Sequence, residues 1–354
     1  LCCGALLRLA CFLFTVKLRA ITIEHDNSAD NLNYICPCLF CNFVCSFSGS
    51  ERRSFRKHSE LYKLSCLKRI RNGFYDITTH WVLGYGTPRF MGQIELVYED
   101  GSREVIASDE NWRVERSAIV SDQIYHGEHY DARREHDGWC TAGYDDSQWA
   151  SAALKRAPCG KLVPQNGPAD RICERFAPLS IERGENGAFR VKFPVEVSGW
   201  VALKNIDAAA GQRISIKYLS ESPGNGANSY TAKGSGNESY HARFTWFVFS
   251  EVEISGIDSL TAAQVEAHAV NSNVQPSGHF ETSNELINTI NRIWQRSQLD
   301  NMHGSIASDC PHRERSAYTG DGQIACVTVM HNFDARTFYN KWIRDIRGAQ
   351  TMDG

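Results

Sequence analysis

The chain carries little excess charge of either sign. Its 38 Lys and Arg residues stand against 41 Asp and Glu residues, which leaves a formal net charge of −3. So small a net charge, of negative sign, gives no electrostatic reason for binding nucleic acid or an anionic membrane surface. We therefore predict that nucleic acid is not a partner.

Long uncharged apolar runs are also missing. The most apolar stretch, residues 1–20, is interrupted by Arg8, Lys17 and Arg19, whereas a membrane-spanning helix needs about 20 mainly apolar residues. We expect no stable membrane insertion. The stretch has no starting Met and no n-region of a signal peptide, so cytoplasmic and secreted locations both stay open.

The cysteines lack the regular spacing of a disulfide framework. Eight of the 13 lie before residue 67, and the other five are scattered along the remaining chain. Disulfide frameworks belong mainly to short secreted chains, so we interpret the later five as free thiols. They are Cys140, Cys159, Cys173, Cys310 and Cys326.

The early cysteines do not form a recognisable zinc motif. Cys36, Cys38, Cys41 and Cys45 match no zinc spacing well, because no second Cys or His pair follows at the distance typical of a zinc finger. We predict that residues 1–72 form a Cys-rich leader of uncertain fold, without a metal.

No repeat of fixed period is evident, and the composition is that of an ordinary globular protein. Hydrophobic residues make up 42% and charged residues 22% of the chain, which excludes disordered and collagen-like classes. With 354 residues, the chain is long enough for two or three domains. Aromatic residues reach 11%, a weak indication of sugar binding because sandwich cores use such rings as well.

Short strand patterns dominate the middle of the sequence. Residues 94–98 and 103–107 alternate around Asp100-Gly101, which predicts a β-hairpin. Gly, Asn, Ser and Pro clusters separate the strands that follow. Such a pattern predicts antiparallel β-sandwiches rather than βαβ units. Further strands are expected at 189–197, 200–204, 213–219, 243–249 and 251–254.

Near residue 277 the apolar period changes to that of helices. Thr282 and Glu285 have the spacing of a capping box, and residues 324–346 have a second helical pattern. An apolar stripe follows the box, formed by Leu286, Ile290, Ile293 and Leu299 with Trp294 beside them. We predict β-sandwich domains at 73–165 and 166–276, and the incomplete opening of an all-helical domain at 277–354.

A charged loop separates the two helical patterns. Residues 308–323 read SDCPHRERSAYTGDGQ, and their proline and glycines disfavour a continuous helix. Arg313 and Arg315 would favour the ionised form of Glu314, whereas Asp309 and Asp321 would raise its pKa by repulsion. A general acid needs a protonated carboxyl near the working pH.

Two plainer interpretations of this loop remain open. Composition alone fits a solvated charged turn held by an Arg–Asp network. A zinc site from Asp309, Cys310, His312 and His331 is conceivable, although no known spacing supports it.

The loop closely resembles the signature Asp-Cys-Pro-x-Arg-Glu-Arg-x-x-x-Thr-Gly-Asp-x-Gln of bacterial α-L-rhamnosidases, glycoside hydrolase family 78. The resemblance extends in family order from about Gly73 to Asp345. It implies two β-sandwich, jelly-roll-like domains followed by an (α/α)6 barrel. The other similar segments are 125–133, 138–149, 198–201, 211–214, 243–245 and 278–286.

The resemblance also implies roles for individual residues. Glu314 would be the general acid that protonates the glycosidic oxygen, with Asp321 supporting it or binding sugar. Asp309 and Arg313 would hold rhamnose hydroxyls. Tyr318 stands where the family usually has Trp, and its ring could still stack on the sugar. Ser316-Ala317 replace the family's usual Leu-Gly.

The family inverts the configuration of the sugar, which requires a second carboxylate. No residue of 1–354 matches the motif of that base, so we predict little activity for this chain alone. The expected substrate is a terminal α-L-rhamnose on pectin, a flavonoid or another glycoside, and no cofactor is needed. The alternative is a non-catalytic carbohydrate-binding β-sandwich protein.

Overall fold

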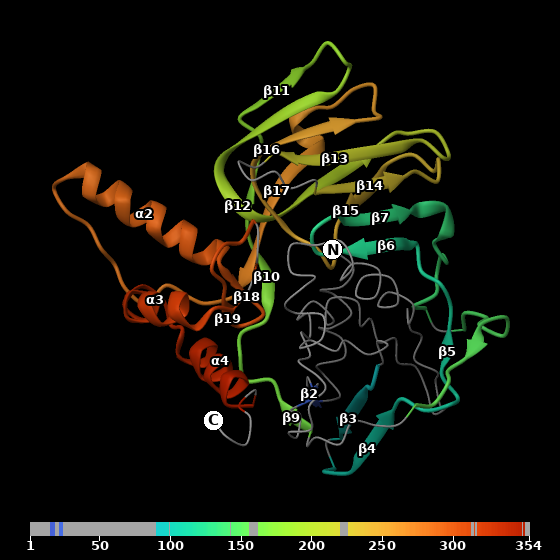
Figure 1. Ribbon diagram of the computed structural model, residues 1–354. Helices are drawn as coiled ribbons and strands as arrows, with labels where there is room; N and C mark the ends of the chain where they lie inside the picture. The colour runs from blue at the N-terminus through green and yellow to red at the C-terminus, as the bar shows by residue number, and fades with distance from the viewer. Residues whose placement is uncertain are drawn as a thin grey trace.

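The computed structural model is rich in β-structure and has three helices among its described residues (Figure 1). It describes residues 90–98, 100–141, 143–155, 162–219, 226–312, 315, 317–348 and 350, together with the backbone of strands β1 (Thr15–Lys17) and β2 (Ile21–Ile23). Apart from those two strands, the predicted leader 1–72 lies outside the described residues, as does Cys159. The described Cys140, Cys173, Cys310 and Cys326 are free thiols, as predicted.

The hairpin predicted around Asp100-Gly101 is confirmed. Strands β3 (Gln93–Val97) and β4 (Arg103–Ala107) pair antiparallel, and β1 pairs with the other edge of β3. Gly101 has φ +80°, a conformation that glycine adopts without steric strain. Two small ladders lie outside this sheet, β2 with β9 (Leu162–Pro164), and β5 (Arg113–Val114) with β8 (Ala150–Ser151).

A curled ten-stranded sheet is the largest sheet of the described residues, and it occupies the upper part of the view in Figure 1. Its path runs β10-β17-β12-β16-β13-β14-β7-β6, and β11 and β15 pair with β12. The strands are β6 (Ile119–Gln123), β7 (Gly127–Asp131), β10 (Asp170–Phe176), β11 (Ser180–Arg183), β12 (Phe189–Ile206), β13 (Arg213–Leu219), β14 (Ala227–Thr231), β15 (Glu238–His241), β16 (Phe247–Ser255) and β17 (Val265–Ser272). Short 3-10 turns occupy Ala132–Arg134 and Ala262–Gln264.

Two pairs of predicted strands differ from the structure. The strands expected at 189–197 and 200–204 are one strand, β12, because Ser198 and Gly199 pair with β16 instead of turning. Pro194 lies in the register shift between Lys192 and Val197, where a residue without an N–H is tolerated. Strand β16 begins at Phe247 and continues through Ser250, so it replaces the strands expected at 243–249 and 251–254.

One pairing crosses the domain boundary that we predicted at residue 165. Strands β7 and β14 pair in parallel, with Tyr130 opposite Tyr230. Gly127 permits this approach, because a Cβ at that position would lie 2.1 Å from the Ala227 carbonyl oxygen. The sheet is therefore continuous across the two predicted sandwich domains, whose division stays a prediction. Its core includes the fully buried Phe249 and Val191.

The helices gather on one side of the sheet (Figure 1). They are α2 (Glu285–Asp300), α3 (Thr319–Asn332) and α4 (Arg336–Gly348), and the hairpin β18 (Met302–His303) with β19 (Ile306–Ala307) lies between α2 and α3. The second helical pattern therefore forms two helices rather than one. The helical conformation is interrupted at Phe333–Ala335, where the Asp334 N–H donates to the Gln275 carbonyl at 2.8 Å.

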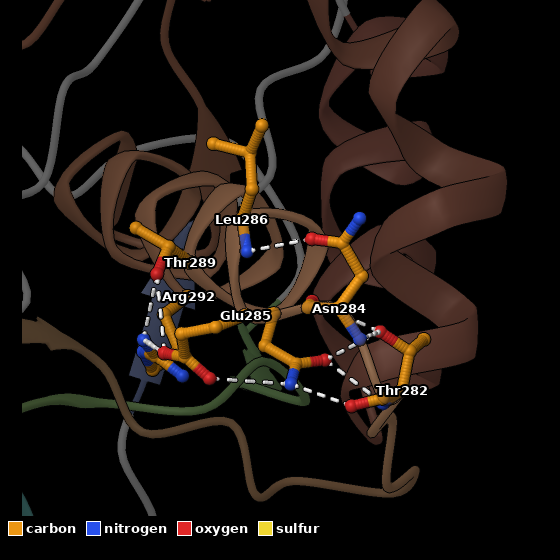
Figure 2. Close-up of polar contacts among 7 residues, drawn as sticks. Thr282, Asn284, Glu285, Leu286, Thr289 and Arg292 are labelled. Carbon is orange, nitrogen blue, oxygen red and sulfur yellow. Dashed lines mark hydrogen bonds and ion pairs between the residues drawn. The ribbon is translucent and has the colours of Figure 1, made fainter.

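The start of α2 differs from the predicted capping box. Asn284 is the N-cap, and its side chain accepts from the Leu286 N–H at 3.0 Å (Figure 2). Glu285 lies in the first turn and bonds Thr289 and Arg292 instead of reaching back to Thr282. The prediction of a capping box was wrong, because that box requires Thr282 as the N-cap and the helix begins two residues later.

The apolar stripe of α2 divides between two environments. Leu286, Ile290 and Ile293 are 67%, 57% and 59% exposed. Trp294 and Leu299 instead pack against a second core that includes Met302, Val329, Phe338 and Trp342. Only the C-terminal half of the stripe therefore faces a core formed by the described residues.

Candidate functional site

The charged loop predicted at 308–323 extends from the end of β19 to the start of α3. Ser308 anchors its beginning, because its N–H donates to the Asn301 carbonyl at 2.9 Å and its hydroxyl to Asn301 Oδ1 at 3.0 Å. The Arg315 N–H closes the loop on the Cys310 carbonyl at 3.1 Å. Arg313, Glu314 and Ser316 lie outside the described residues, so the predicted acid has no described geometry.

The loop is shorter than predicted, because α3 begins at Thr319 and includes Gly320 and Gly322. Gly322 serves packing rather than a turn. A Cβ at residue 322 would lie 1.8 Å from Trp342 Cη2, so the bare backbone lets α3 approach the indole of α4.

The other predicted site residues lie at the two ends of the loop. Asp309 is half-buried and accepts from Cys310 Sγ at 3.4 Å. Tyr318 is the N-cap position of α3 and is 47% exposed. Asp321 lies in the first turn of α3, where the helix dipole stabilises a carboxylate. The spacing of i and i+3 brings Tyr318 and Asp321 to one side of the helix start.

Arg315 was predicted only to favour the ionised form of Glu314, and the structure gives it a different set of contacts, with carbonyl oxygens and aromatic rings. It is 9% exposed and has φ +56°, a left-handed conformation that is uncommon outside glycine. Its Nε donates to the Pro311 carbonyl at 2.9 Å, and its Nη1 donates to the Ile124 carbonyl. Burial lowers the pKa of Arg315 to about 10. Among the described residues, no carboxylate forms an ion pair with this guanidinium.

Aromatic rings of the β-structure surround Arg315. Its guanidinium carbon lies 4.1 Å from the ring centroid of Trp246 and 5.3 Å from that of Phe247. Trp246 also stacks on His303, with centroids 3.8 Å apart and planes 7° from parallel. Trp246 therefore contacts both the charged loop and the β18–β19 hairpin.

A buried polar network joins this hairpin to the sheet. The Gly304 N–H donates to both Asp170 carboxylate oxygens at 2.8 and 3.0 Å, and Ser272 Oγ donates to Asp170 Oδ1 at 2.8 Å. The Ser198 N–H donates to Asp300 Oδ1 at 2.7 Å. Burial raises the pKa of Asp300 to about 7. These contacts fix the C-terminus of α2 and the hairpin on β10, β12 and β17.

Asp170, His303 and Ser198 resemble a nucleophilic triad in composition only. His303 Nε2 lies 2.7 Å from Ser198 Oγ and 3.2 Å from the Asp300 carbonyl, and Ser198 Oγ donates to the Val270 carbonyl at 3.1 Å. These partners assign the ring proton to Nε2, the reverse of a base that takes a serine proton. Ser198 is also fully buried. The trio is therefore structural.

Two carboxylates, the half-buried Asp122 and the fully buried Glu128, lie on strands β6 and β7. Asp122 and Glu128 are opposite each other in the β6–β7 ladder. Burial raises the pKa of Asp122 to about 7 and also raises the pKa of Glu128. Glu128 accepts from the Arg243 N–H at 3.1 Å and pairs with its guanidinium at 3.4 Å. We interpret this group as part of the sheet's interior.

Within the described residues, no three His, Cys, Asp or Glu side chains gather closely enough to hold a metal ion. That search included Asp309, Cys310, His312 and His331, the residues of the conceivable zinc site. None of the described helices is both long and apolar enough to cross a membrane.

Comparison with known families decides the relationship. Residues 68–174 match the α-L-rhamnosidase N-terminal domain, and residues 275–354 match the bacterial α-L-rhamnosidase 6 hairpin glycosidase domain. The chain belongs to the bacterial-type α-L-rhamnosidases. An α-L-rhamnosidase from Formosa agariphila is 32% identical over 304 residues, which are 78% of this chain and 32% of the relative.

Solved α-L-rhamnosidases have the same fold over the matched part. The enzyme from Dictyoglumus thermophilum matches with a TM-score of 0.71 and 36% identity, over 76% of this chain and 32% of that chain. The enzyme from Streptomyces avermitilis, complexed with L-rhamnose, matches with a TM-score of 0.70 and 28% identity, over 74% and 27%. The chain thus spans about a third or less of these α-L-rhamnosidases.

Proposed function

We propose that this chain contributes the general acid of an inverting glycoside hydrolase that removes terminal α-L-rhamnose from glycosides. The observation that carries the proposal is the match of residues 275–354 to the six-hairpin glycosidase domain. This region contains the loop 308–323, whose Asp309, Glu314 and Asp321 provide the carboxyls that acid catalysis needs. The complex of the Streptomyces avermitilis relative with L-rhamnose supports the choice of sugar.

Each predicted site residue has a role in this proposal. Glu314 protonates the departing glycosidic oxygen, and Asp321 supports it from the first turn of α3. Asp309 and Arg313 bind rhamnose hydroxyls. The exposed ring of Tyr318 covers the apolar face of the sugar.

The proposed architecture has two β-sandwich domains, at 73–165 and 166–276, before an (α/α)6 barrel that begins at 277. The curled sheet and the few helices are compatible with it, and the two family models match in the same order.

Inversion also needs a base that activates water on the opposite face of the sugar, with the two carboxyls roughly 6.5–9.5 Å apart. We propose that this base comes from the part of the relatives' length that the chain does not span. Residues 1–354 alone should then hydrolyse rhamnosides very slowly, since a general base contributes about 10²- to 10⁴-fold.

The test is release of phenol, a poor leaving group that needs a proton, from phenyl α-L-rhamnoside by an extended enzyme, in which this chain continues to the full length of its relatives. Glu314→Gln should lower kcat by about 10²- to 10⁴-fold, because the amide cannot donate the required proton. Glu182→Gln is the matched control, since Glu182 is exposed on β11. An extended enzyme without activity, or an unchanged rate after Glu314→Gln, would contradict the proposal.

A further inference from the structure

Arg315, the residue that follows Glu314, contacts three parts of the structure: its own loop, the segment after β6 and an aromatic ring. The Arg315 N–H donates to the Cys310 carbonyl at 3.1 Å, and its Nε donates to the Pro311 carbonyl at 2.9 Å, so the loop is tied back on itself. Its Nη1 donates to the Ile124 carbonyl, immediately after β6. The backbone at residue 315 is thus fixed both within the loop and against the β-structure.

The third contact is with the aromatic ring. The Arg315 guanidinium carbon lies 4.1 Å from the Trp246 ring centroid, and Trp246 stacks on His303 at 3.8 Å. His303 in turn lies 2.7 Å from Ser198 Oγ on β12. A continuous series of contacts therefore links the sheet, through the indole, to the residue beside Glu314.

Arginine suits this position for a physical reason. Its planar guanidinium donates in fixed directions and stacks on a ring at the same time, whereas a lysine ammonium does neither in this way. The guanidinium is nine-tenths buried and is occupied by two carbonyls. Its contacts are thus those of a group that holds the loop.

We propose that Arg315 and Trp246 form a clamp through which the β-structure positions the carboxyl of Glu314 for proton donation. Arg315 is then a positioning residue, because it acts through the backbone of its neighbour. This inference rests on the proposed role of Glu314 as the acid.

The test uses the dependence of the rate on the leaving group. A phenolate that is a poor leaving group needs a proton as the bond breaks, whereas 2,4-dinitrophenolate leaves with little help. Misplacing the acid should therefore slow hydrolysis of phenyl α-L-rhamnoside far more than that of the 2,4-dinitrophenyl compound. A general loss of folding would slow both equally.

In the extended enzyme, Trp246→Leu and Arg315→Lys should each lower kcat on the phenyl substrate by about 10²-fold, which is typical of a 1 Å misplacement. The rate on the dinitrophenyl substrate should change less than about threefold, with KM little altered. Trp246→Phe retains a ring for the guanidinium and should keep most of the activity. Arg183→Met is the control, since exposed Arg183 stacks on Phe189 in another part of the sheet.

The outcomes separate this inference from the proposed function. If Glu314→Gln is selective for the phenyl substrate but Trp246→Leu and Arg315→Lys slow both substrates equally, the clamp is wrong and the acid stands. If Glu314→Gln slows both substrates equally, the assignment of Glu314 as the acid is wrong, and the proposed clamp is wrong as well. If Trp246→Leu does not fold, the milder Arg315→Lys decides by the same ratio of rates.

Discussion

At the scale of single residues, close contacts explain positions that composition alone misinterprets. Gly320 and Gly322 both look like helix breakers in the sequence, yet both lie inside α3. Only Gly322 is confined, since a Cβ there would meet the rigid indole of Trp342, whereas a Cβ at Gly320 meets nothing within 4 Å. The two positions form a natural pair for comparison.

Gly322→Ala should destabilise the protein by about 1–3 kcal/mol, because an added methyl must displace Trp342. Gly320→Ala should instead be neutral or stabilise it by up to about 1 kcal/mol, because alanine lowers the entropy of the unfolded chain. Urea denaturation followed by circular dichroism measures both free energies of unfolding. Equal effects of the two substitutions would show that α3 and α4 do not pack this closely.

Single residues also show how much of the candidate site could be predicted from the sequence. The motif led to the choice of Glu314 as the acid, which stays a proposal, and Asp309 and Asp321 are motif positions too. Tyr318 was chosen because it stands where the family usually has Trp. The role of Arg315 could not be predicted, because its partners Ile124 and Trp246 are remote in the chain and only folding brings them together.

At the scale of elements, local patterns succeeded where pairing was local. The β3–β4 hairpin and strand β13 were predicted correctly, since turn residues bound alternating runs. The division of β12 at Ser198-Gly199 was wrong, because pairing with β16 and β17 overrides the local turn preference. The parallel pairing of β7 with β14 joins distant segments, and periodicity gives no signal for it.

The start of α2 gives a test at this scale. Asn284→Ala should destabilise the helix by about 1 kcal/mol, since the Leu286 N–H loses its acceptor. Asn284→Asp retains an acceptor and should preserve stability. Thermal unfolding of the three proteins provides the comparison. A wild-type melting temperature for Asn284→Ala would mean that Thr282, as the capping box predicted, is the effective cap.

At the scale of the whole molecule, buried polar groups connect the helices to the sheet. Asp300 is the last residue of α2 and binds β12 through the Ser198 N–H. Its pKa is raised by burial from 3.8 to about 7. A carboxyl with a raised folded-state pKa stabilises the fold most when protonated, so this contribution is complete below about pH 4 and is lost as pH rises to about 7.

Asp300→Asn should therefore flatten the pH dependence of stability between about pH 4 and 7, where one released proton changes the free energy by up to about 1.4 kcal/mol per pH unit. The amide keeps an oxygen for the Ser198 N–H but cannot ionise. Chemical denaturation at several pH values measures the slope, and Asp258→Asn, at an exposed position, is the control. The same slope in both variants would show that Asp300 ionises freely in the folded protein.

The parallel contact between β7 and β14 has a consequence for the order of folding. The ribosome synthesises the β6–β7 hairpin well before β14. The N–H and C=O groups on one edge of β7 therefore stay unpaired until β14 has been synthesised. Unpaired strand edges promote association with other chains. A polypeptide ending near residue 165 would keep that edge permanently open, and it should aggregate, whereas one continuing through residue 231 supplies its own cover.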